Sequence, residues 1–405
     1  MLIEPCNLTE QKARIFVLGV GGGGGNALNR MIEEGMSSVD FIAINTDAQD
    51  LEYNNSQTKL QIGKELTGGL GAGADSEIGR KAVEENKEII SKTIVPADMI
   101  FITAGMGGGT GSGAGPAIAK IAKDMGKLTV GVVTKPFLFE GPIRKKRAIK
   151  AIEELKKSCD TLLVIPNEIL LNITDSKTTV QNSFKLADTV LLQATKGISD
   201  LINVPGLINL DFADVKKIMQ NMGDAVMGTG IATGEERALL ATQQAINSPL
   251  LQDQSISGAK GCLVNITSSA ELGIHELNEA SKLIYEEAGD KAEVILGFTI
   301  DDTLNDEIRV TVIATGLDSN DMPTADSVPQ YNTLEDQRPR FMPQNLFDNE
   351  EDKNETSSSS TTINHTELEN NEENVSEEVK QENESLTFGD NDFDVPAYIR
   401  NNQNN

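Results

Sequence analysis

The sequence predicts an α/β fold: a doubly wound, Rossmann-like domain, a long central helix, a second α+β domain with a mixed sheet, and a disordered C-terminal tail. Three observations lead to this prediction. Short runs of valine and isoleucine alternate with helix-like stretches, a long amphipathic segment follows them, and the composition then becomes acidic and polar. A chain of 405 residues is long enough for two domains and a tail.

The first domain is predicted from apolar runs that are nearly unbroken, which is typical of strands buried on both faces of a parallel sheet. The runs are residues 15–19, 41–45, 99–104, 128–134 and 161–165. Stretches such as 77–92 and 115–125 fit the helices between them. Because doubly wound sheets bind ligands at the carboxyl ends of their strands, the loops that follow these runs are candidate binding loops.

A long helix is predicted for residues 178–203, because apolar residues recur there at spacings of three and four. A coiled coil is the alternative, but its seam would contain alanine and extend for only three heptads. We therefore expect a central helix between two domains, ended by Pro205 and Gly206. Its buried stripe would be Val180, Phe184, Ala187, Leu191, Ala194, Ile198 and Leu201.

The second domain is expected at residues 205–317. Helical stretches at about 213–222 and 235–247 precede apolar runs at 262–266, 294–299 and 308–314, and a helix at Ile274–Ala288 separates the first two runs. This order indicates an α+β layer with a mixed sheet.

The net charge of −27 is unevenly distributed, since residues 318–405 hold 21 acidic and 5 basic side chains. Residues 318–385 are expected to be a disordered linker, because they bury too little apolar surface to offset chain entropy. A nucleic-acid partner is not expected without a basic face. The last segment, 386–405, contains a short cluster of apolar residues closed by one arginine: Phe393, Val395, Pro396, Tyr398, Ile399 and Arg400.

Cysteine and histidine content excludes other classes of chemistry. The three cysteines lack CxxC spacing, so we expect reduced thiols in a cytoplasmic protein and no metal site. Two histidines leave little for histidine-based catalysis. The N-terminal extension, 1–12, lacks the long apolar core of a signal peptide. The sequence contains no stretch of about 18 apolar residues, so no membrane span is predicted.

A first glycine loop, Gly19-Val-Gly-Gly-Gly-Gly-Gly-Asn26, lies between a predicted strand and a predicted helix. Such a loop lets backbone N–H groups approach an anion, and the helix N-terminus adds about half a positive charge. Gly19, Gly21 and Gly24 satisfy the dinucleotide fingerprint, and Asp47 could serve as its ribose-binding acid. By itself this loop favours a nicotinamide or flavin enzyme, and a tight turn without a ligand is the simpler alternative.

Two further glycine loops change that interpretation. The segment GMGGGTGSG at 105–113 follows the strand at 99–104, and a dinucleotide enzyme has no need of it. Two such loops can surround a triphosphate, and GGLGAG at 68–73 could cover its terminal phosphate. No GxxxxGK[ST] motif occurs, so the sequence predicts a nucleotide site without a P-loop lysine.

Several motifs together resemble the tubulin/FtsZ family of cytoskeletal GTPases. They are GGGTGSG at 107–113, GVGGGGGNA at 19–27, NTDAQ at 45–49, GAGA at 71–74, VVTKPF at 132–137 and NLDFADV at 209–215. The resemblance covers about residues 12–317 and the tail cluster. The first loop is unlike that of tubulin and the tail resembles that of FtsZ. Ser112 is a small departure, because bacterial relatives often carry threonine there.

The resemblance implies a GTP/GDP site in residues 13–177. The residues implied to cradle the phosphates are Gly22, Gly23, Gly24, Gly25, Asn26, Gly109, Thr110 and Gly111. Those near the γ-phosphate are Ala72 and Gly73, and those at the ribose and a nearby phosphate are Glu140 and Arg144. Pro142 and Ile143 stand between the last two where polar residues were expected. Magnesium is expected on the phosphates, with no protein ligand that we can name.

Asn167, Phe184 and Asp188 are implied to contact guanine. A carboxylate can accept from guanine N1–H and its exocyclic amine, a pair that adenine lacks. Phe184 and Asp188 are four residues apart and therefore share a helix face. The alternatives are ordinary core packing for Phe184 and a solvated helix position for Asp188.

Asn209, Asp211 and Asp214 form a second constellation, at a predicted helix start. The simple interpretation of the two aspartates is an N-cap and a first-turn acid. The resemblance implies that all three residues meet the nucleotide of the next subunit and position the attacking water.

The resemblance therefore implies a GTPase that polymerises head to tail and builds the ring at the mid-cell division site. The central helix would be 178–204 and the GTPase-activating domain 205–317. Membrane-tethering and regulatory partners would bind Phe393, Pro396, Tyr398, Ile399 and Arg400. The alternatives are a dinucleotide-dependent oxidoreductase and a nucleotide-binding structural protein that polymerises without turnover.

Overall fold

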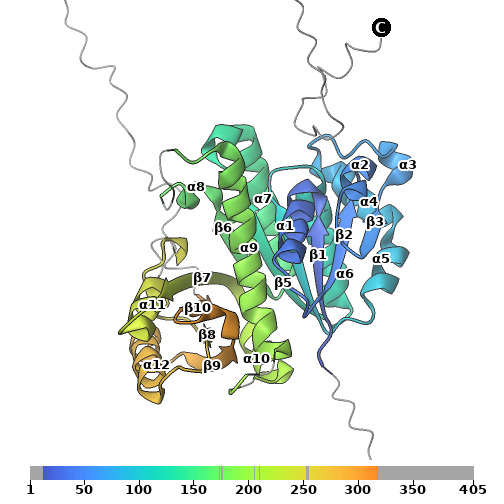
Figure 1. Cartoon of the computed structure of the whole chain (residues 1–405). Coiled ribbons are helices and arrows are strands. Elements are labelled where there is room, and N and C mark those ends of the chain that lie inside the picture. Colours follow the sequence, from blue (N-terminus) through green and yellow to red (C-terminus); the bar gives the residue numbers. More distant parts are fainter. Residues whose placement is uncertain are drawn as a thin grey trace, which may run out of the picture. The chain divides into compact units, whose positions relative to one another are not determined.

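The computed structural model describes residues 12–317, apart from 173, 175–176, 205, 209 and 252–254. The predicted linker and the tail cluster at Phe393–Arg400 lie outside the described residues. The strands of the described part form one sheet in the order β3-β2-β1-β4-β5-β6-β7-β10-β8-β9 (Figure 1).

The first six strands are all parallel, as the unbroken apolar runs predict. They are β1 (Ile15–Val20), β2 (Asp40–Asn45), β3 (Thr58–Gln61), β4 (Met99–Gly105), β5 (Leu128–Lys135) and β6 (Thr161–Pro166). All six residues of β1 are buried, because helices cover both faces of the sheet. The short edge strand β3 was not predicted, since its sequence, TKLQ, has no apolar run.

The helices divide between the two faces of this sheet (Figure 1). On one face, α1 (Gly21–Glu33) and α9 (Val180–Asn203) share a core with Ile15 and Val17. On the other face, four helices share a core with Phe16 and Leu18. These are α4 (Ser76–Glu85), α5 (Lys87–Ile94), α6 (Thr110–Asp124) and α7 (Pro142–Ser158). The alternation along β1 thus directs its side chains into two separate cores.

Two helix predictions need correction. The single helix expected at 77–92 is broken at Asn86, whose side chain accepts a hydrogen bond from the backbone N–H of Gly63 at 2.8 Å. The helix expected at 115–125 begins five residues earlier, at Thr110, so the second half of GMGGGTGSG is helical. Glycine lowers helix propensity and hid this start from the pattern.

The central helix α9 is present, and its 24 residues make it about 36 Å long. The predicted stripe is buried from Ala187 to Leu201. The prediction is wrong for Val180 and Phe184, which are 61% and 40% exposed. The N-terminal part of α9 therefore extends past the core and leaves these two side chains accessible.

The second half carries the mixed sheet that was predicted. β10 (Ile308–Thr315) is antiparallel to both β7 (Gly223–Ala232) and β8 (Gly261–Ser268), and β8 is parallel to β9 (Glu293–Ile300). Its helices are α10 (Phe212–Met219), α11 (Arg237–Ile246) and α12 (Ile274–Ala288). The boundaries proposed for the domains stay a prediction.

Strand β7 was missed because glycines interrupt its apolar pattern. A Cβ atom at Gly228 or Gly230 would lie 1.9 Å from the carbonyl oxygen of Ala245 or Ala241 in α11. Glycine is therefore required for the close approach of helix and strand. β7 also pairs with β6 at three positions, which joins both halves into one sheet.

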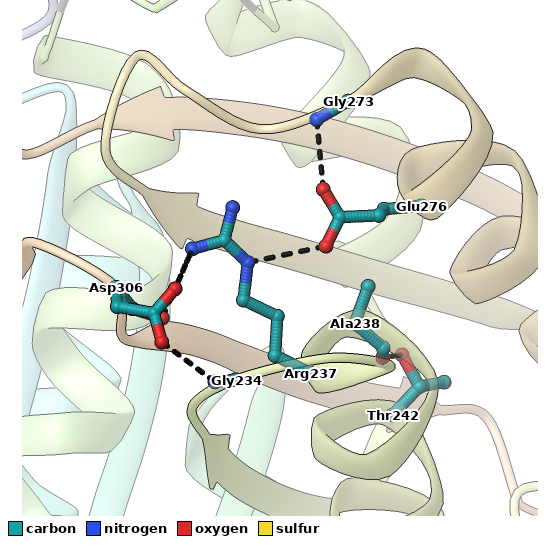
Figure 2. Close-up of polar contacts among 7 residues, drawn as sticks. All are labelled: Gly234, Arg237, Ala238, Thr242, Gly273, Glu276 and Asp306. Atoms are coloured by element: carbon teal, nitrogen blue, oxygen red, sulfur yellow. Dashed lines mark hydrogen bonds and ion pairs between the residues drawn. The ribbon is translucent and has the colours of Figure 1, made fainter.

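A buried arginine ties the helices of the second half together (Figure 2). Arg237 is 7% exposed, and its Nε donates to Glu276 Oε1 at 3.1 Å. Its Nη1 donates to Asp306 Oδ1 at 2.7 Å, and Glu276 Oε2 accepts from the N–H of Gly273 at 2.9 Å. Because two carboxylates offset the buried cation, this cluster holds α11, α12 and the β9–β10 connection in place.

Candidate functional site

The first two glycine loops meet at the carboxyl edge of the parallel strands. A Cβ atom at Gly24 would lie 2.5 Å from the Thr103 carbonyl oxygen, and one at Gly21 would lie 2.9 Å from the Gly111 nitrogen. The loops after β1 and β4 therefore pack backbone against backbone. Since α1 begins at Gly21, the glycines at 21–25 form its first turns, where N–H groups lack partners within the helix.

The third loop packs on the second. A Cβ atom at Gly109 would lie 2.8 Å from the Cβ atom of Ala72. In contrast, a Cβ atom at Gly73 or Gly108 would meet nothing within 4 Å. The predicted phosphate-binding residues thus come together from three loops around an open space beside the N-termini of α1 and α6, which suits an anion.

Two hydroxyl groups hold the loop before α6 in shape. Ser112 Oγ accepts a hydrogen bond from the Gly107 N–H at 2.8 Å, a role that a threonine hydroxyl can also perform. The Thr110 hydroxyl lies 2.7 Å from that of Thr46, which follows β2. Thr46 belongs to the NTDAQ motif, but no role was predicted for its side chain, because nothing in the sequence indicates that β2 and α6 meet there.

Glu140 and Arg144 lie together beside the same loop. Arg144 Nε is 3.1 Å from Glu140 Oε2, and Glu140 Oε1 accepts from the Phe137 N–H at 2.8 Å. A Cβ atom at Gly107 would lie 2.8 Å from the Arg144 carbonyl oxygen, so α7 begins against the glycine loop. Pro142 is the first residue of α7, a position that tolerates proline, which explains this departure from the expected polar residue.

The three residues predicted to contact guanine differ in their surroundings. Phe184 is 40% exposed and forms an edge-to-face pair with Phe137, with ring centroids 5.3 Å apart, so core packing does not account for it. Asn167 is buried at the start of α8 (Asn167–Leu170), and its Oδ1 has no hydrogen-bond partner within the described residues. An orphaned buried acceptor is costly and fits a site that a ligand donor completes.

Asp188 is half-buried on α9. Burial raises its pKa from 3.8 to about 7, although nearby Arg30 acts in the opposite direction. The free carboxyl group therefore titrates near neutral pH, which is unusual for an exposed helix position. The solvated-surface alternative does not describe it.

Asp47 does not behave as a ribose-binding acid. Its Oδ1 accepts from the N–H groups of Gln49 and Asp50 at 3.0 and 3.3 Å and caps α2 (Ala48–Glu52). The interpretation as a dinucleotide-binding enzyme thereby loses its candidate for the ribose-binding acid.

Asp211 and Asp214 are exposed at the start of α10, and Asn209 lies outside the described residues. Helix α10 lies near the amino-terminal ends of the parallel strands, whereas the glycine loops lie at their carboxyl ends. Asn203, the last residue of α9, donates to the Ser38 carbonyl oxygen just before β2, and the Met219 carbonyl oxygen at the end of α10 accepts a hydrogen bond from Thr161, the first residue of β6. The glycine loops, in contrast, follow the last residues of β1 and β4. Within one chain, the structure does not bring these acids to the predicted nucleotide residues.

Three glycine loops at one edge of this sheet define a nucleotide-binding α/β protein. Residues 14–175 match the Tubulin/FtsZ family, GTPase domain, and residues 223–318 match the FtsZ family, C-terminal domain. The chain therefore belongs to the tubulin/FtsZ family and is a tubulin-like GTPase of its FtsZ branch.

Solved structures agree with this membership. An empty FtsZ dimer from M. jannaschii is 45% identical, with a TM-score of 0.74 over 77% of this chain and 90% of that chain. A point variant of FtsZ from M. jannaschii is also 45% identical, with a TM-score of 0.72 over 76% and 92%. GDP-bound CetZ1 from Haloferax volcanii shares the fold at 21% identity, with a TM-score of 0.65 over 76% and 95%.

Proposed function

We propose that this chain polymerises head to tail with GTP and that the next subunit completes the hydrolytic site. One observation carries the proposal: the glycine loops lie at the carboxyl ends of the parallel strands, and the acids of α10 lie toward the opposite ends of the same strands. Helix α9, about 36 Å long, extends from the side of Phe184 to the side of α10. A second copy stacked along this direction would bring its acids to the nucleotide of the first.

The nucleotide site has a simple division of labour. The N–H groups at the starts of α1 and α6 would bind the phosphates, while Ala72 and Gly73 would approach the terminal one. Arg144, held by Glu140, would add positive charge where the chain has no P-loop lysine. Asn167 Oδ1 and the Asp188 carboxylate would accept from guanine, and Phe184 would stack on it.

The acids of α10 would act on water. Asp214, with Asp211 and Asn209, would orient and polarise the water that attacks the γ-phosphate of the neighbouring subunit's GTP, because phosphoryl transfer depends mainly on positioning and charge. Magnesium, when bound, would offset the phosphate charge. We assign it to the phosphates, whose oxygen atoms are the ligands that magnesium prefers.

The family and the tail suggest the cellular role. We propose a cytoplasmic filament that forms the division ring and reaches the membrane through partners that bind Phe393, Pro396, Tyr398, Ile399 and Arg400. No helix among the described residues is long and apolar enough to cross a membrane. The dimer of the FtsZ relative supports self-association.

Hydrolysis by mixed subunits tests the proposal. Asp188→Ala would impair the nucleotide site but keep the acids, and Asp214→Ala would do the reverse. If the next subunit completes the site, a mixture should hydrolyse GTP faster than either variant by itself, and the parent's activity per subunit should rise steeply with concentration. Activity that stays constant on dilution, with no gain on mixing, would exclude catalysis between subunits.

A further inference from the structure

An acidic side chain that no motif predicted lies against the first phosphate-binding helix. A Cβ atom built at Gly22 would lie 3.3 Å from Asp50 Oδ2, and one at Gly25 would lie 3.9 Å from it. Gly22 and Gly25 are three residues apart on one face of α1, within its first two turns. The carboxylate of Asp50 therefore faces the part of α1 that would hold an anion.

A hydrogen-bond network fixes Asp50 in this position. Asn45, which is 5% exposed at the end of β2, donates from Nδ2 to Asp50 Oδ2 at 2.6 Å. Asn45 is itself held, because its Oδ1 accepts from the Thr46 N–H at 2.9 Å. Asn54, from the same connection, donates to the Gly25 carbonyl oxygen at 2.9 Å. The segment after β2 is thus tied to α1, and Asp50 has little freedom to turn away.

No cation within the described residues forms an ion pair with Asp50. Burial and the neighbouring carboxylate of Asp47 raise the pKa of Asp50, and the hydrogen bond from Asn45 lowers it. The charged form is therefore already disfavoured before any ligand binds. A phosphate group placed beside α1 would add a second repulsion of the same sign.

We propose that Asp50 makes nucleotide binding depend on a divalent cation, because its negative charge repels a bare triphosphate from the N-terminus of α1. The inference rests on the proposed phosphate-binding role of α1. A nucleotide that carries its cation has much of its charge neutralised and meets little repulsion. Asp50 thereby selects the metal-loaded nucleotide, the form that is competent for hydrolysis, without itself holding the metal.

Two other roles for Asp50 predict different behaviour. As a first-turn acid of α2 it would affect stability only, and α2 is a helix of five residues. As a ligand of the cation it would strengthen binding of the metal-loaded nucleotide. Removal of its charge therefore distinguishes the three roles.

The experiment compares Asp50→Asn with Glu52→Gln in the full chain. Asparagine keeps an acceptor for Asn45 and removes the charge, while Glu52→Gln removes the same charge from an exposed position of the same helix. Calorimetry would measure the affinity for GTP with excess magnesium and with EDTA. A third variant, Asp50→Glu, restores the charge and should restore the parent's behaviour.

We expect Asp50→Asn to raise the affinity for GTP in EDTA on the order of tenfold, with little change in magnesium, so that the magnesium dependence shrinks. Glu52→Gln should retain the full dependence. An Asp50→Asn profile equal to that of Glu52→Gln overturns the inference, as does weaker binding in magnesium. If the parent binds no GTP in either condition, the proposed function fails as well, so the two failures are distinguishable.

Discussion

Asp211 Oδ1 accepts a hydrogen bond from the backbone N–H of Asp214 at 2.8 Å, and this contact forms the N-cap of α10. The two acids that the motif places together thus have different local roles. Asp211 stabilises the helix start, while the exposed side chain of Asp214 takes no part in the cap. The capping interpretation is confirmed for Asp211, and a catalytic role for either acid stays a proposal.

Asp214→Ala should bind GTP normally and lose most turnover, by about 10²–10⁴ in rate, because a group that positions the attacking water would be gone. Steady-state phosphate release above the polymerisation threshold measures the effect. Asp211→Ala provides the contrast, since it should also lower helix stability by roughly 1 kcal/mol. A folded Asp214→Ala protein with the parent's turnover would exclude the proposed role.

The affinity for GTP should depend on pH through Asp188. Its pKa is about 7 in the nucleotide-free protein, so the carboxyl group is partly protonated near neutral pH. Only the ionised carboxylate can accept hydrogen bonds from the N–H groups of guanine, so GTP must bind the protein with Asp188 ionised. Below pH 7 the parent's affinity should therefore fall by up to about tenfold per pH unit, relative to Asp188→Asn. Titration calorimetry of both proteins measures the difference, and parallel pH profiles would remove Asp188 from the guanine site.

The same group should affect the stability of the nucleotide-free protein in the opposite sense to an ordinary salt-bridged aspartate. The folded pKa is raised from 3.8 to about 7, so the folded state binds the proton more tightly than the unfolded state between these values. The stabilisation is complete below pH 3.8 and is lost as the pH rises toward 7. Chemical denaturation should show this loss in the parent and a smaller one in Asp188→Asn.

Two positions on α9 should separate binding from stability. Phe184→Ala should weaken GTP binding by about 1–3 kcal/mol through lost stacking and change the free energy of unfolding by only about 1 kcal/mol, since Phe184 is 40% exposed. Leu191→Ala, at a position 2% exposed, should cost about 2–5 kcal/mol of stability. Denaturant titration and calorimetry on both variants check this. Equal losses of stability would mean that Phe184 is a core residue after all.

Deletion of residues 393–400 should leave polymerisation and GTP turnover unchanged, yet release filaments from vesicles that carry the membrane-tethering partner. Aromatic anchors and an arginine dominate many small interfaces, and an acidic linker would keep them extended from the filament. Co-flotation of filaments with such vesicles measures the attachment. Truncated filaments that float as well as full-length ones would show that the cluster has no docking role.

The fold was largely predictable, and the exceptions have clear physical causes. Buried parallel strands such as β1 appear in the sequence as unbroken apolar runs, and all five predicted runs in the first half became strands. β7 did not appear in this way, because contacts with α11 require glycine at Gly228 and Gly230. The stripe on α9 was overextended, since periodicity shows which side of a helix is apolar but not where the covering core ends.

The sequence by itself determined the presence of three glycine loops, the positions of two of them after strands, and the acids at a helix start, because backbone conformation and capping depend on local residue types. Only the tertiary structure decided which of these features meet. It placed Gly21 against Gly111 and Asp50 against Gly22, and it put α10 at the amino-terminal ends of the strands, opposite the glycine loops. Such proximities depend on strand order and register, which bring distant segments together and leave no trace in local sequence patterns.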